Sequence, residues 1–252
     1  MLINTPLDDL LAMRTTTAFQ MELQATVIEA LRSSRHALNL GEDAFLAVLS
    51  ADEWGQSSID PEEERFLSPR ACAKKKTEFV LGRAAVGYAL RELGEYGHVL
   101  RGDAGEPIWP EGMSGSITHC WPWAAALVVR SWMPLAVGID LESLEKVARS
   151  DISSVICTAG ELDWARHGVS FNERLAMIFS AKEAVYKAFY PCCQQYIDFQ
   201  DVELSWRPER QSFGVSVLAG TNAQLPSLRE CEVRCRCFDG FVFSCMVHEP
   251  ER

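Results

Sequence analysis

Two acidic side chains, two residues apart, form the first group in this sequence whose types and spacing could do chemistry. They are Asp140 and Glu142, within the segment GIDLE. In a strand, alternate side chains share a face, so these carboxylates project together while Ile139 and Leu141 project into the opposite layer. Adjacent carboxylates are unfavourable unless a cation lies between them or one is protonated, and oxygen ligands of this kind suit Mg²⁺. Taken alone, the segment favours a simpler alternative, a strand that runs into an acidic turn.

A helical pattern about forty residues further on strengthens the chemical interpretation. With Leu175 at the centre of its apolar stripe, Lys182 falls inside the stripe, and Glu183 and Lys187 lie at its edge beside small residues. A lysine side chain is long enough to extend from such a face into a cleft. The alternative is an ordinary surface salt bridge between Glu183 and Lys187, worth about 0.2–0.5 kcal/mol, which does not account for Lys182.

A third candidate is the segment SGSITHCWPWAAA at 114–126. Gly115, Ser116 and Thr118 predict a small-residue turn whose backbone amides could meet a phosphate. His119 adds a donor that titrates near neutral pH. A lone histidine is more often structural, but this one lies at the mouth of a predicted strand, which favours a functional role.

Eight of the 24 Lys and Arg residues lie between 65 and 101, a basic segment in an otherwise acidic chain. A helix is predicted here, capped by Ser68 with Pro69 at its first position and ending at Gly94. On this helix Arg83 lies two turns from Lys76, and Lys75 lies slightly to the side. Two spaced cations could bind one phosphate, although a solvated helix face is the alternative for any single lysine.

Composition limits the class of protein. The chain has 252 residues, 48% of them hydrophobic, enough for one large core or two small ones. The net charge of −11 argues against a general nucleic-acid binder, which needs a basic surface. No window approaches the roughly 20 apolar residues that span a bilayer, and no signal-peptide pattern opens the chain, so we expect a cytoplasmic protein with no membrane partner. The nine cysteines include no CxxC pair and are expected to be reduced thiols.

The remaining pattern predicts an α+β protein. Two apolar runs, at 124–129 and 135–142, predict a hairpin. Helix followed by antiparallel strands occurs twice along the chain, which indicates two pseudo-symmetric α/β halves, each a helix on a mainly antiparallel sheet, with the active site at their interface. The other predicted elements are a helix within 1–40, strands at 44–50, 199–206, 212–219, 230–238 and 241–247, and a helix over 171–190.

Taken together, the motifs resemble one known family. GIDLE followed by FSAKEAVYKA is similar to the paired signature of 4′-phosphopantetheinyl transferases of the Sfp/EntD class. Four further segments resemble the EntD-like branch in the same order: KKKTEFVLGRAAVGYALRELG, GEPIWPEGMSGSITHC, CTAGEL and GFVFSCMV. The resemblance covers roughly residues 65–247.

The resemblance implies a holo-[acyl-carrier-protein] synthase. Such an enzyme transfers the 4′-phosphopantetheine group from coenzyme A to a serine of an acyl or peptidyl carrier protein and releases 3′,5′-ADP. It requires Mg²⁺, with Mn²⁺ as an alternative. The carriers belong to fatty-acid, polyketide or nonribosomal-peptide synthesis, and a monomer with halves at 1–137 and 138–252 is expected.

Roles for individual residues follow from the matching positions. The resemblance implies that Asp140, Glu142 and Glu183 bind the metal ion, with Asp140 also next to coenzyme A. Glu183 is then also the general base for the carrier serine. Lys187 neutralises charge on the leaving phosphate, and Lys182 assists it.

The coenzyme contacts are implied in the same way. His119 and the turn from Ser116 to Thr118 hold phosphates, while Lys75 and Arg83 bind the 3′-phosphate of coenzyme A. The segment Gly105, Glu106, Pro107 lies near adenine.

Two positions depart from the family pattern. Ala104 stands where relatives often carry Lys or Arg, and Arg101 is a candidate to replace that charge. Pro122 stands where glycine is common, which leaves the shape of its loop open. Two alternatives to the transferase therefore remain: an inert module that binds coenzyme A or a carrier, and a Mg²⁺-dependent hydrolase of a diphosphate ester.

Overall fold

The computed structural model describes residues 17–32, 38–52, 66, 71–133, 135–218 and 231–249. Before residue 136 the helices and strands are α2 (Ala18–Arg32), β1 (Ala44–Ser50), α4 (Ala73–Glu92), β2 (Leu100–Arg101), β3 (Pro107–Ile108), β4 (Met113–Cys120) and β5 (Trp123–Arg130). From residue 136 onward they are β6 (Ala136–Ser143), α5 (Leu144–Ala148), α6 (Ser153–Ile156), α7 (Ala159–Arg166), α8 (Phe171–Cys193), β7 (Val202–Arg207), β8 (Ser212–Val217), β9 (Glu232–Phe238) and β10 (Phe241–His248), with short 3-10 turns at Phe199–Asp201 and Pro208–Arg210.

Two antiparallel sheets form the frame, and they confirm the predicted α+β class. The first sheet has the order β1-β5-β4, and the second has the order β6-β10-β9-β8-β7. The predicted hairpin between 124–129 and 135–142 is wrong, because β5 pairs with β1 and β4 while β6 pairs with β10. The runs were correctly predicted as strands, but their uniform apolar character did not reveal their partners. The predicted boundary at 137/138 falls inside β6, and the division into two domains stays a prediction.

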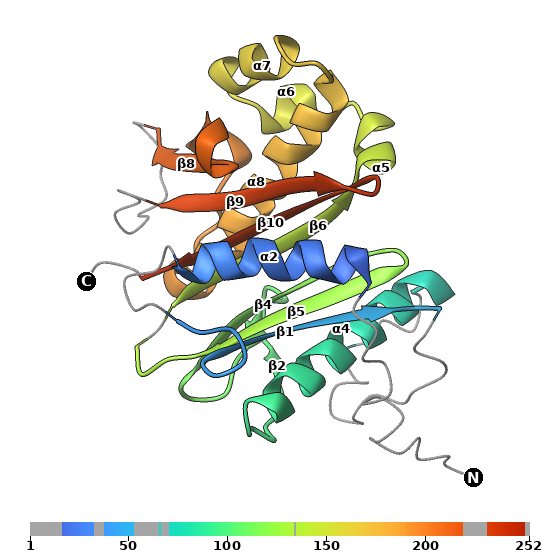
Figure 1. Cartoon of the computed structure of the whole chain (residues 1–252), viewed down its shortest axis with the longest axis vertical. Helices are drawn as coiled ribbons and strands as arrows, with labels where there is room; N and C mark the ends of the chain where they lie inside the picture. The colour runs from blue at the N-terminus through green and yellow to red at the C-terminus, as the bar shows by residue number, and fades with distance from the viewer. Residues whose placement is uncertain are drawn as a thin grey trace.

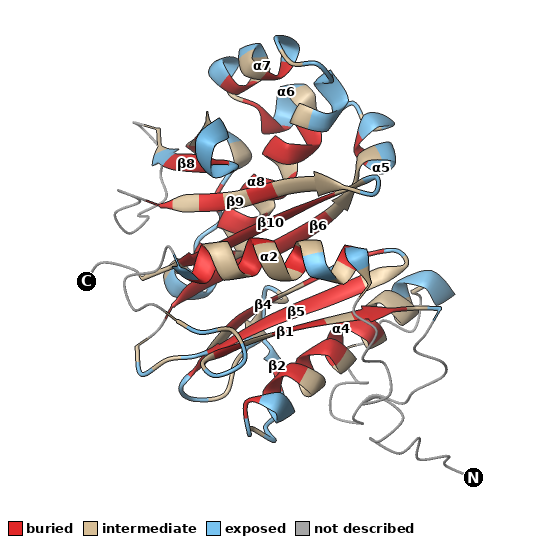
Figure 2. Ribbon diagram, viewed as in Figure 1, coloured by how far each residue is buried: buried red, intermediate tan, exposed pale blue. Residues whose placement is uncertain are grey.

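Helices cover both faces of these sheets. Residues of α4 pack with β1 and β5 in one core cluster, and residues of α8 pack with the second sheet in another. A third cluster places α2 over strands of both sheets, and in Figure 1 this blue helix crosses the front of the molecule between them. The red, buried stretches in Figure 2 follow these contacts, along the strands and the inner sides of α2 and α8.

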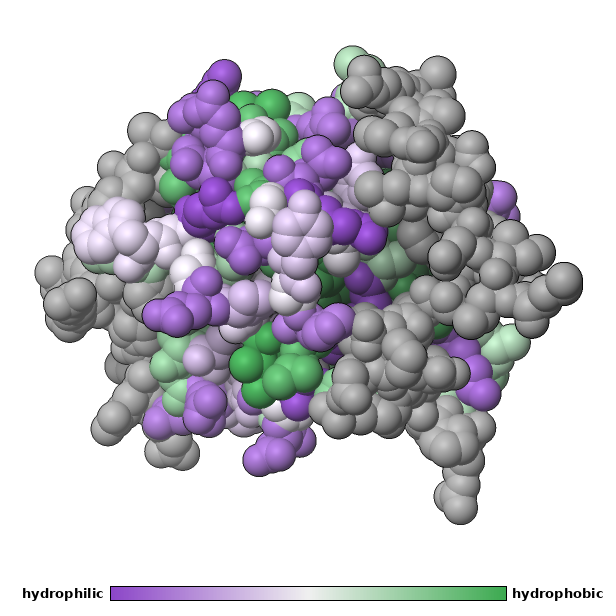
Figure 3. All heavy atoms as spheres, turned by 90° about the horizontal axis from the view of Figure 1, so that it is seen from below, coloured by the Kyte–Doolittle hydropathy of each residue, from purple (hydrophilic) through white to green (hydrophobic). Residues whose placement is uncertain are grey.

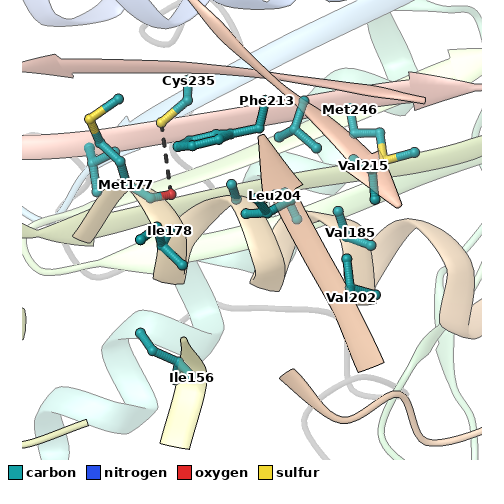
Figure 4. Close-up of a cluster of buried hydrophobic side chains, with 14 of the residues drawn as sticks. Ile156, Met177, Ile178, Val185, Val202, Leu204, Phe213, Val215, Cys235 and Met246 are labelled. Carbon is teal, nitrogen blue, oxygen red and sulfur yellow. Dashed lines mark hydrogen bonds between the residues drawn. The ribbon is translucent and has the colours of Figure 1, made fainter. Parts of the chain in front are cut away.

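The largest core lies between α8 and the second sheet. Figure 4 shows Met177, Ile178 and Val185 of α8 in one buried cluster with Leu204 of β7 and Phe213 of β8. The predicted stripe on this helix is therefore confirmed. No disulfide links the cysteines of the described residues, and several of them are buried in this core.

The helix α4 begins later than the sequence predicts. Its first residue is Ala73, with Cys72 in the extended N-cap position, and the predicted cap at Ser68 and Pro69 lies outside the described residues. It ends as predicted, because Gly94 has a φ of +76°.

Figure 3 views the molecule from the end at which α4 lies, where hydrophilic side chains surround a few apolar ones.

The two sheets meet where β4 lies beside β6, and side-chain hydroxyls join them. Alternate hydroxyls of β4 accept hydrogen bonds from backbone N–H groups in and just before β6. The pairs are Ser114 with Leu135, Ser116 with Ile139 and Thr118 with Leu141, at 3.2, 3.0 and 3.0 Å. Because these hydroxyls satisfy buried backbone donors, they fix the position of GIDLE relative to the first sheet.

Gly138 lets α8 approach β6 closely. A β-carbon at this position would lie 1.9 Å from the carbonyl oxygen of Ala184. The hydroxyl of Ser180, one turn earlier, donates a hydrogen bond of 3.3 Å to the carbonyl oxygen of Asp140. The small residues of α8 therefore place its polar edge directly beside the acidic strand.

We expect Gly138→Ala to lower the free energy of unfolding by about 1–3 kcal/mol or more, because the added methyl group overpacks this contact. Gly87→Ala in α4 is the matched control, since nothing lies within 4 Å of a β-carbon there. That change should raise stability by up to about 1 kcal/mol. Urea denaturation of the two variants measures both effects, and equal effects would contradict the close approach of α8.

Candidate functional site

Side chains of α4, β4, β6 and α8 converge on one cavity of about 730 Å³ at the seam of the two sheets. Strand β6 contributes two carboxylates, α8 a carboxylate and an ammonium group, and the end of β4 an imidazole. The predicted site residues that line it are Lys75, Thr118, His119, Asp140, Glu142, Glu183 and Lys187. The sequence therefore correctly predicts that GIDLE and FSAKEAVYKA meet.

Asp140 is the most buried acid of this group, with 3% of its surface exposed. Its Oδ1 atom accepts hydrogen bonds from Lys187 Nζ at 2.7 Å and from the hydroxyl of Thr118 at 3.3 Å. Its Oδ2 atom is buried and has no hydrogen-bond partner. A buried carboxylate oxygen without a partner is costly, so this atom is an available ligand for a cation.

The ionised forms of the two glutamates beside Asp140 are disfavoured. Burial first, and then the charge of Asp140, raise the pKa of both Glu142 and Glu183 above the usual range. Lys146 opposes this shift at Glu142, whose Oε2 atom accepts a hydrogen bond of 3.2 Å from Lys146 Nζ. Lys187 opposes the shift at Glu183. Three carboxylates are thus crowded together beside Lys146 and Lys187, while Lys74 and Lys75 line the same cavity from α4.

His119 borders the cavity with about half of its side chain exposed. Its Nδ1 atom lies 4.0 Å from Glu78 Oε2 of α4. Burial of the ring lowers the pKa of His119, against the opposing effect of Glu78, so the neutral form is favoured. A neutral imidazole both donates and accepts hydrogen bonds.

The predicted phosphate-binding turn at Gly115, Ser116 and Thr118 is wrong. These residues lie within β4 and pair in register with β5. Small residues are needed here for a different reason, because a β-carbon at Gly115 would lie 2.6 Å from the carbonyl oxygen of Leu127. The hydroxyls of Ser116 and Thr118 serve the seam instead.

A second cavity, of about 370 Å³, adjoins the first. Both are lined by Glu78, Ile117, His119 and Lys187, so the two spaces lie side by side. The second is lined largely by apolar groups and by the predicted residues Arg83, Gly105, Glu106 and Pro107. The carboxylate of Glu106 accepts a hydrogen bond from the backbone N–H of Ala104 at 3.1 Å, which closes its own loop.

Lys75 and Arg83 line different cavities, so the structure does not bring these two predicted phosphate ligands together. Eight residues of helix separate them by about 12 Å along the axis. Lys75 is exposed beside the carboxylates, whereas Arg83 is 7% exposed in the second cavity. Arg83 donates to the carbonyl oxygen of Val99, and its guanidinium lies 5.2 Å from the centre of the Phe79 ring.

The prediction that Lys182 extends into the cleft to assist at phosphate is wrong. Lys182 is 3% exposed, and its Nζ atom lies 2.7 Å from Glu161 Oε2. The same ammonium donates to the carbonyl oxygens of Ile156 and Phe199. Burial lowers the pKa of Lys182, which Glu161 opposes. The CTAGEL segment therefore supplies a buried counter-ion for a lysine of α8, and the apolar spacing of α8 alone did not reveal this role.

Sequence reasoning also missed Lys146, which pairs with Glu142. Its spacing, four residues after Glu142 at the start of a short helix, was the available signal. Among the described residues, no three His, Cys, Asp or Glu side chains are already grouped closely enough to hold a metal ion by themselves. No helix in the same set is long and apolar enough to cross a bilayer.

Comparison with known proteins identifies the class to which this fold and site belong. The family model of the 4′-phosphopantetheinyl transferase N-terminal domain matches residues 62–129, and that of the 4′-phosphopantetheinyl transferase superfamily matches residues 136–230. The chain therefore belongs to the 4′-phosphopantetheinyl transferase superfamily. The resemblance predicted from GIDLE and FSAKEAVYKA is confirmed.

Individual relatives agree. 4′-Phosphopantetheinyl transferase PptT of Mycobacterium tuberculosis is 33% identical over 169 residues, which cover 67% of this chain and 74% of the relative. 4′-Phosphopantetheinyl transferase Svp of Streptomyces mobaraensis is 34% identical over 168 residues, which cover 64% of this chain and 67% of the relative. Enterobactin synthase component D of Escherichia coli is 39% identical over 117 residues, 46% of this chain and 55% of the relative.

We expect Lys182→Ala to lower the free energy of unfolding by about 3–5 kcal/mol, because it leaves Glu161 buried without its cation. Arg149→Ala is the control, since it removes an exposed ion pair with Glu145 and should cost about 0–1 kcal/mol. Chemical denaturation measures both variants. Indistinguishable losses would show that the buried pair does not anchor α8.

Proposed function

We propose that this protein transfers the 4′-phosphopantetheine group from coenzyme A to a serine of an acyl or peptidyl carrier protein, with Mg²⁺ held by Asp140, Glu142 and Glu183. The observation that carries the proposal is the buried, unsatisfied Oδ2 atom of Asp140 among the crowded carboxylates. The cavity around it adjoins a second, more apolar one. This arrangement suits a ligand with a diphosphate at one end and a nucleotide at the other.

The donor set fits Mg²⁺. Carboxylate oxygens are the ligands this ion prefers, and it usually takes only a few from protein and others from substrate phosphates. That preference agrees with the lack of a complete metal cage in the described residues. When bound, the ion would neutralise charge on the diphosphate and on the three carboxylates. Lys187 and Lys146, which pair with Asp140 and Glu142, would then be released to other partners.

Glu183 is the proposed general base. It would accept the proton of the carrier serine as the serine oxygen forms a bond to the β-phosphorus of coenzyme A. The bond from that phosphorus to the bridging oxygen would break, and 3′,5′-ADP would leave. Burial raises the pKa of Glu183, and the cation proposed beside it would keep the carboxylate ionised, as a general base must be.

Lys187 would act on the leaving group. It projects from α8 one turn after Glu183, and it lines both cavities. An ammonium at this point can stabilise the negative charge that develops on the leaving diphosphate oxygen. His119, which also borders both cavities, would donate a hydrogen bond to the same phosphates.

The rest of coenzyme A would extend in two directions. The second cavity, with Phe79, Ile117 and Pro107 in its wall, suits the adenine ring. A smaller pocket of about 200 Å³ borders Glu183 and is lined by Tyr186 and Tyr196 among others, which suits the pantetheine arm.

The test is to incubate the protein with coenzyme A, Mg²⁺ and an apo carrier protein and to weigh the carrier by mass spectrometry. We expect one phosphopantetheine group on one serine, and no gain after Mg²⁺ is removed with EDTA. Consumption of coenzyme A with an unmodified carrier would favour the hydrolase. Binding without consumption would favour the inert module.

In the same assay, Asp140→Ala should abolish transfer, because it removes the buried carboxylate oxygen proposed to bind Mg²⁺. Asp151→Ala changes an exposed acid outside the cavities and should leave transfer unchanged. Normal transfer by Asp140→Ala would remove the metal assignment.

A further inference from the structure

The first cavity has an exposed tryptophan beside a lysine at its edge. Trp121 lies in the turn between β4 and β5, and 42% of its surface is exposed. The Nζ atom of Lys74, in the first turn of α4, lies 5.8 Å from the centre of the indole ring. Both residues line the cavity of about 730 Å³ that Glu183 also lines. Tryptophan is enriched among the residues that dominate binding between proteins, so an exposed one at this place indicates a contact surface.

The turn that carries Trp121 is held in place on both of its sides. The carbonyl oxygen of Pro122 accepts a hydrogen bond of 2.8 Å from the backbone N–H of Ala51, just after β1. The next side chain, Trp123, stacks on Phe19 of α2 with ring centres 4.3 Å apart and an angle of 13° between the planes. Because the turn is already fixed, little conformational freedom is lost when a partner covers Trp121.

Cations surround this tryptophan. Four of the six lysines of the chain line the cavity, and three of them are exposed there: Lys74 and Lys75 on α4, and Lys146 on α5. In Figure 1, α5 and the first turn of α4 lie on the same side of the molecule. Among the described residues, no carboxylate lies within ion-pair distance of Lys74 or Lys75, and 68% of the Lys146 side chain is exposed although it pairs with Glu142. We call Lys74, Lys75, Trp121 and Lys146 the basic rim.

The geometry of the proposed transfer decides what covers the basic rim. The serine that accepts phosphopantetheine must bring its oxygen to Glu183, in the first cavity. Coenzyme A is proposed to occupy the second cavity and the pocket beside Tyr186, so the acceptor protein has to approach over the first. The chain has a net charge of −11, and a local group of exposed cations is therefore where an acidic partner is attracted and not repelled.

We propose that the basic rim is the docking surface for an acidic face of the apo carrier protein, with an apolar carrier side chain against the indole of Trp121. The proposal rests on the proposed function, because it takes a carrier serine as the acceptor. It gives the β4–β5 turn and the beginning of α4 a role in partner recognition, separate from the binding of coenzyme A and of the metal ion.

Steady-state kinetics with varied apo carrier protein, at saturating coenzyme A and Mg²⁺, test the proposal. We expect kcat/KM for the carrier to fall about 10-fold or more in Trp121→Ala and about 5- to 10-fold in Lys74→Glu, with kcat at saturating carrier within about twofold of wild type. Affinity for coenzyme A, measured by isothermal titration calorimetry without carrier, should also stay within about twofold, which shows that each variant is folded.

Two matched controls lie outside both cavities. Trp132→Ala removes a tryptophan that is 80% exposed, and Arg91→Glu reverses an exposed charge on the same helix as Lys74. Both variants should keep the wild-type kcat/KM for the carrier, because neither side chain belongs to the basic rim.

Salt and a charge-reversed carrier sharpen the test. Because salt screens exposed charges, raising NaCl from about 0.05 to about 0.5 M should lower kcat/KM more for wild type than for Lys74→Glu. A carrier with lysine in place of an acidic residue beside its serine should be a poorer substrate for wild type and should lose less with Lys74→Glu.

The possible failures are distinct. Wild-type kcat/KM for the carrier in both Trp121→Ala and Lys74→Glu, or an equal loss of affinity for coenzyme A, would overturn the docking surface. Failure of the wild-type protein to modify the carrier at all would overturn the proposed function, and this proposal with it.

Discussion

The hydroxyl contacts between β4 and β6 are the constraint on which the site depends. No backbone ladder joins these neighbouring strands, and side chains such as Thr118 bridge them instead. The same hydroxyl that accepts from the backbone of Leu141 also donates to the carboxylate of Asp140. The joint between the two sheets and the orientation of the most buried acid are therefore one interaction network, and a change in the joint would also change the site.

Helix α8 is fixed against this joint from two sides. Gly138 and the small residues of α8 allow the helix to lie directly on β6, which brings Glu183 to the carboxylates of GIDLE. On another side of the helix, Lys182 is buried against Glu161. The pKa values of Glu142 and Glu183 are raised, so keeping both side chains ionised costs folding free energy. Such a cost is common at functional sites, where like charges are held together for function and not for stability.

Local periodicity predicted most elements, because alternation and helical spacing depend on residues close in sequence. The meeting of GIDLE and FSAKEAVYKA was implied by the family resemblance. Periodicity failed where the answer depended on distant partners. The run at 124–129 is buried on both faces, so it carries no signal for pairing with β1 rather than β6. Gly115 and Ser116 were predicted as a turn because small residues also favour turns, but here they fit β4 between two neighbours. The burial of Lys182 depends on Glu161, twenty-one residues earlier.

The central claim is that carboxylates of β6 and α8 share one divalent ion with the substrate diphosphate. The most direct test of this claim is a crystal structure of the protein with coenzyme A and Mn²⁺, in which an anomalous difference map locates the metal ion. We predict one strong peak bonded to Asp140, Glu142 and Glu183 and to diphosphate oxygens, with Lys187 moved from Asp140 to a phosphate. A peak bonded to the diphosphate alone, with Lys187 still paired to Asp140, would contradict it.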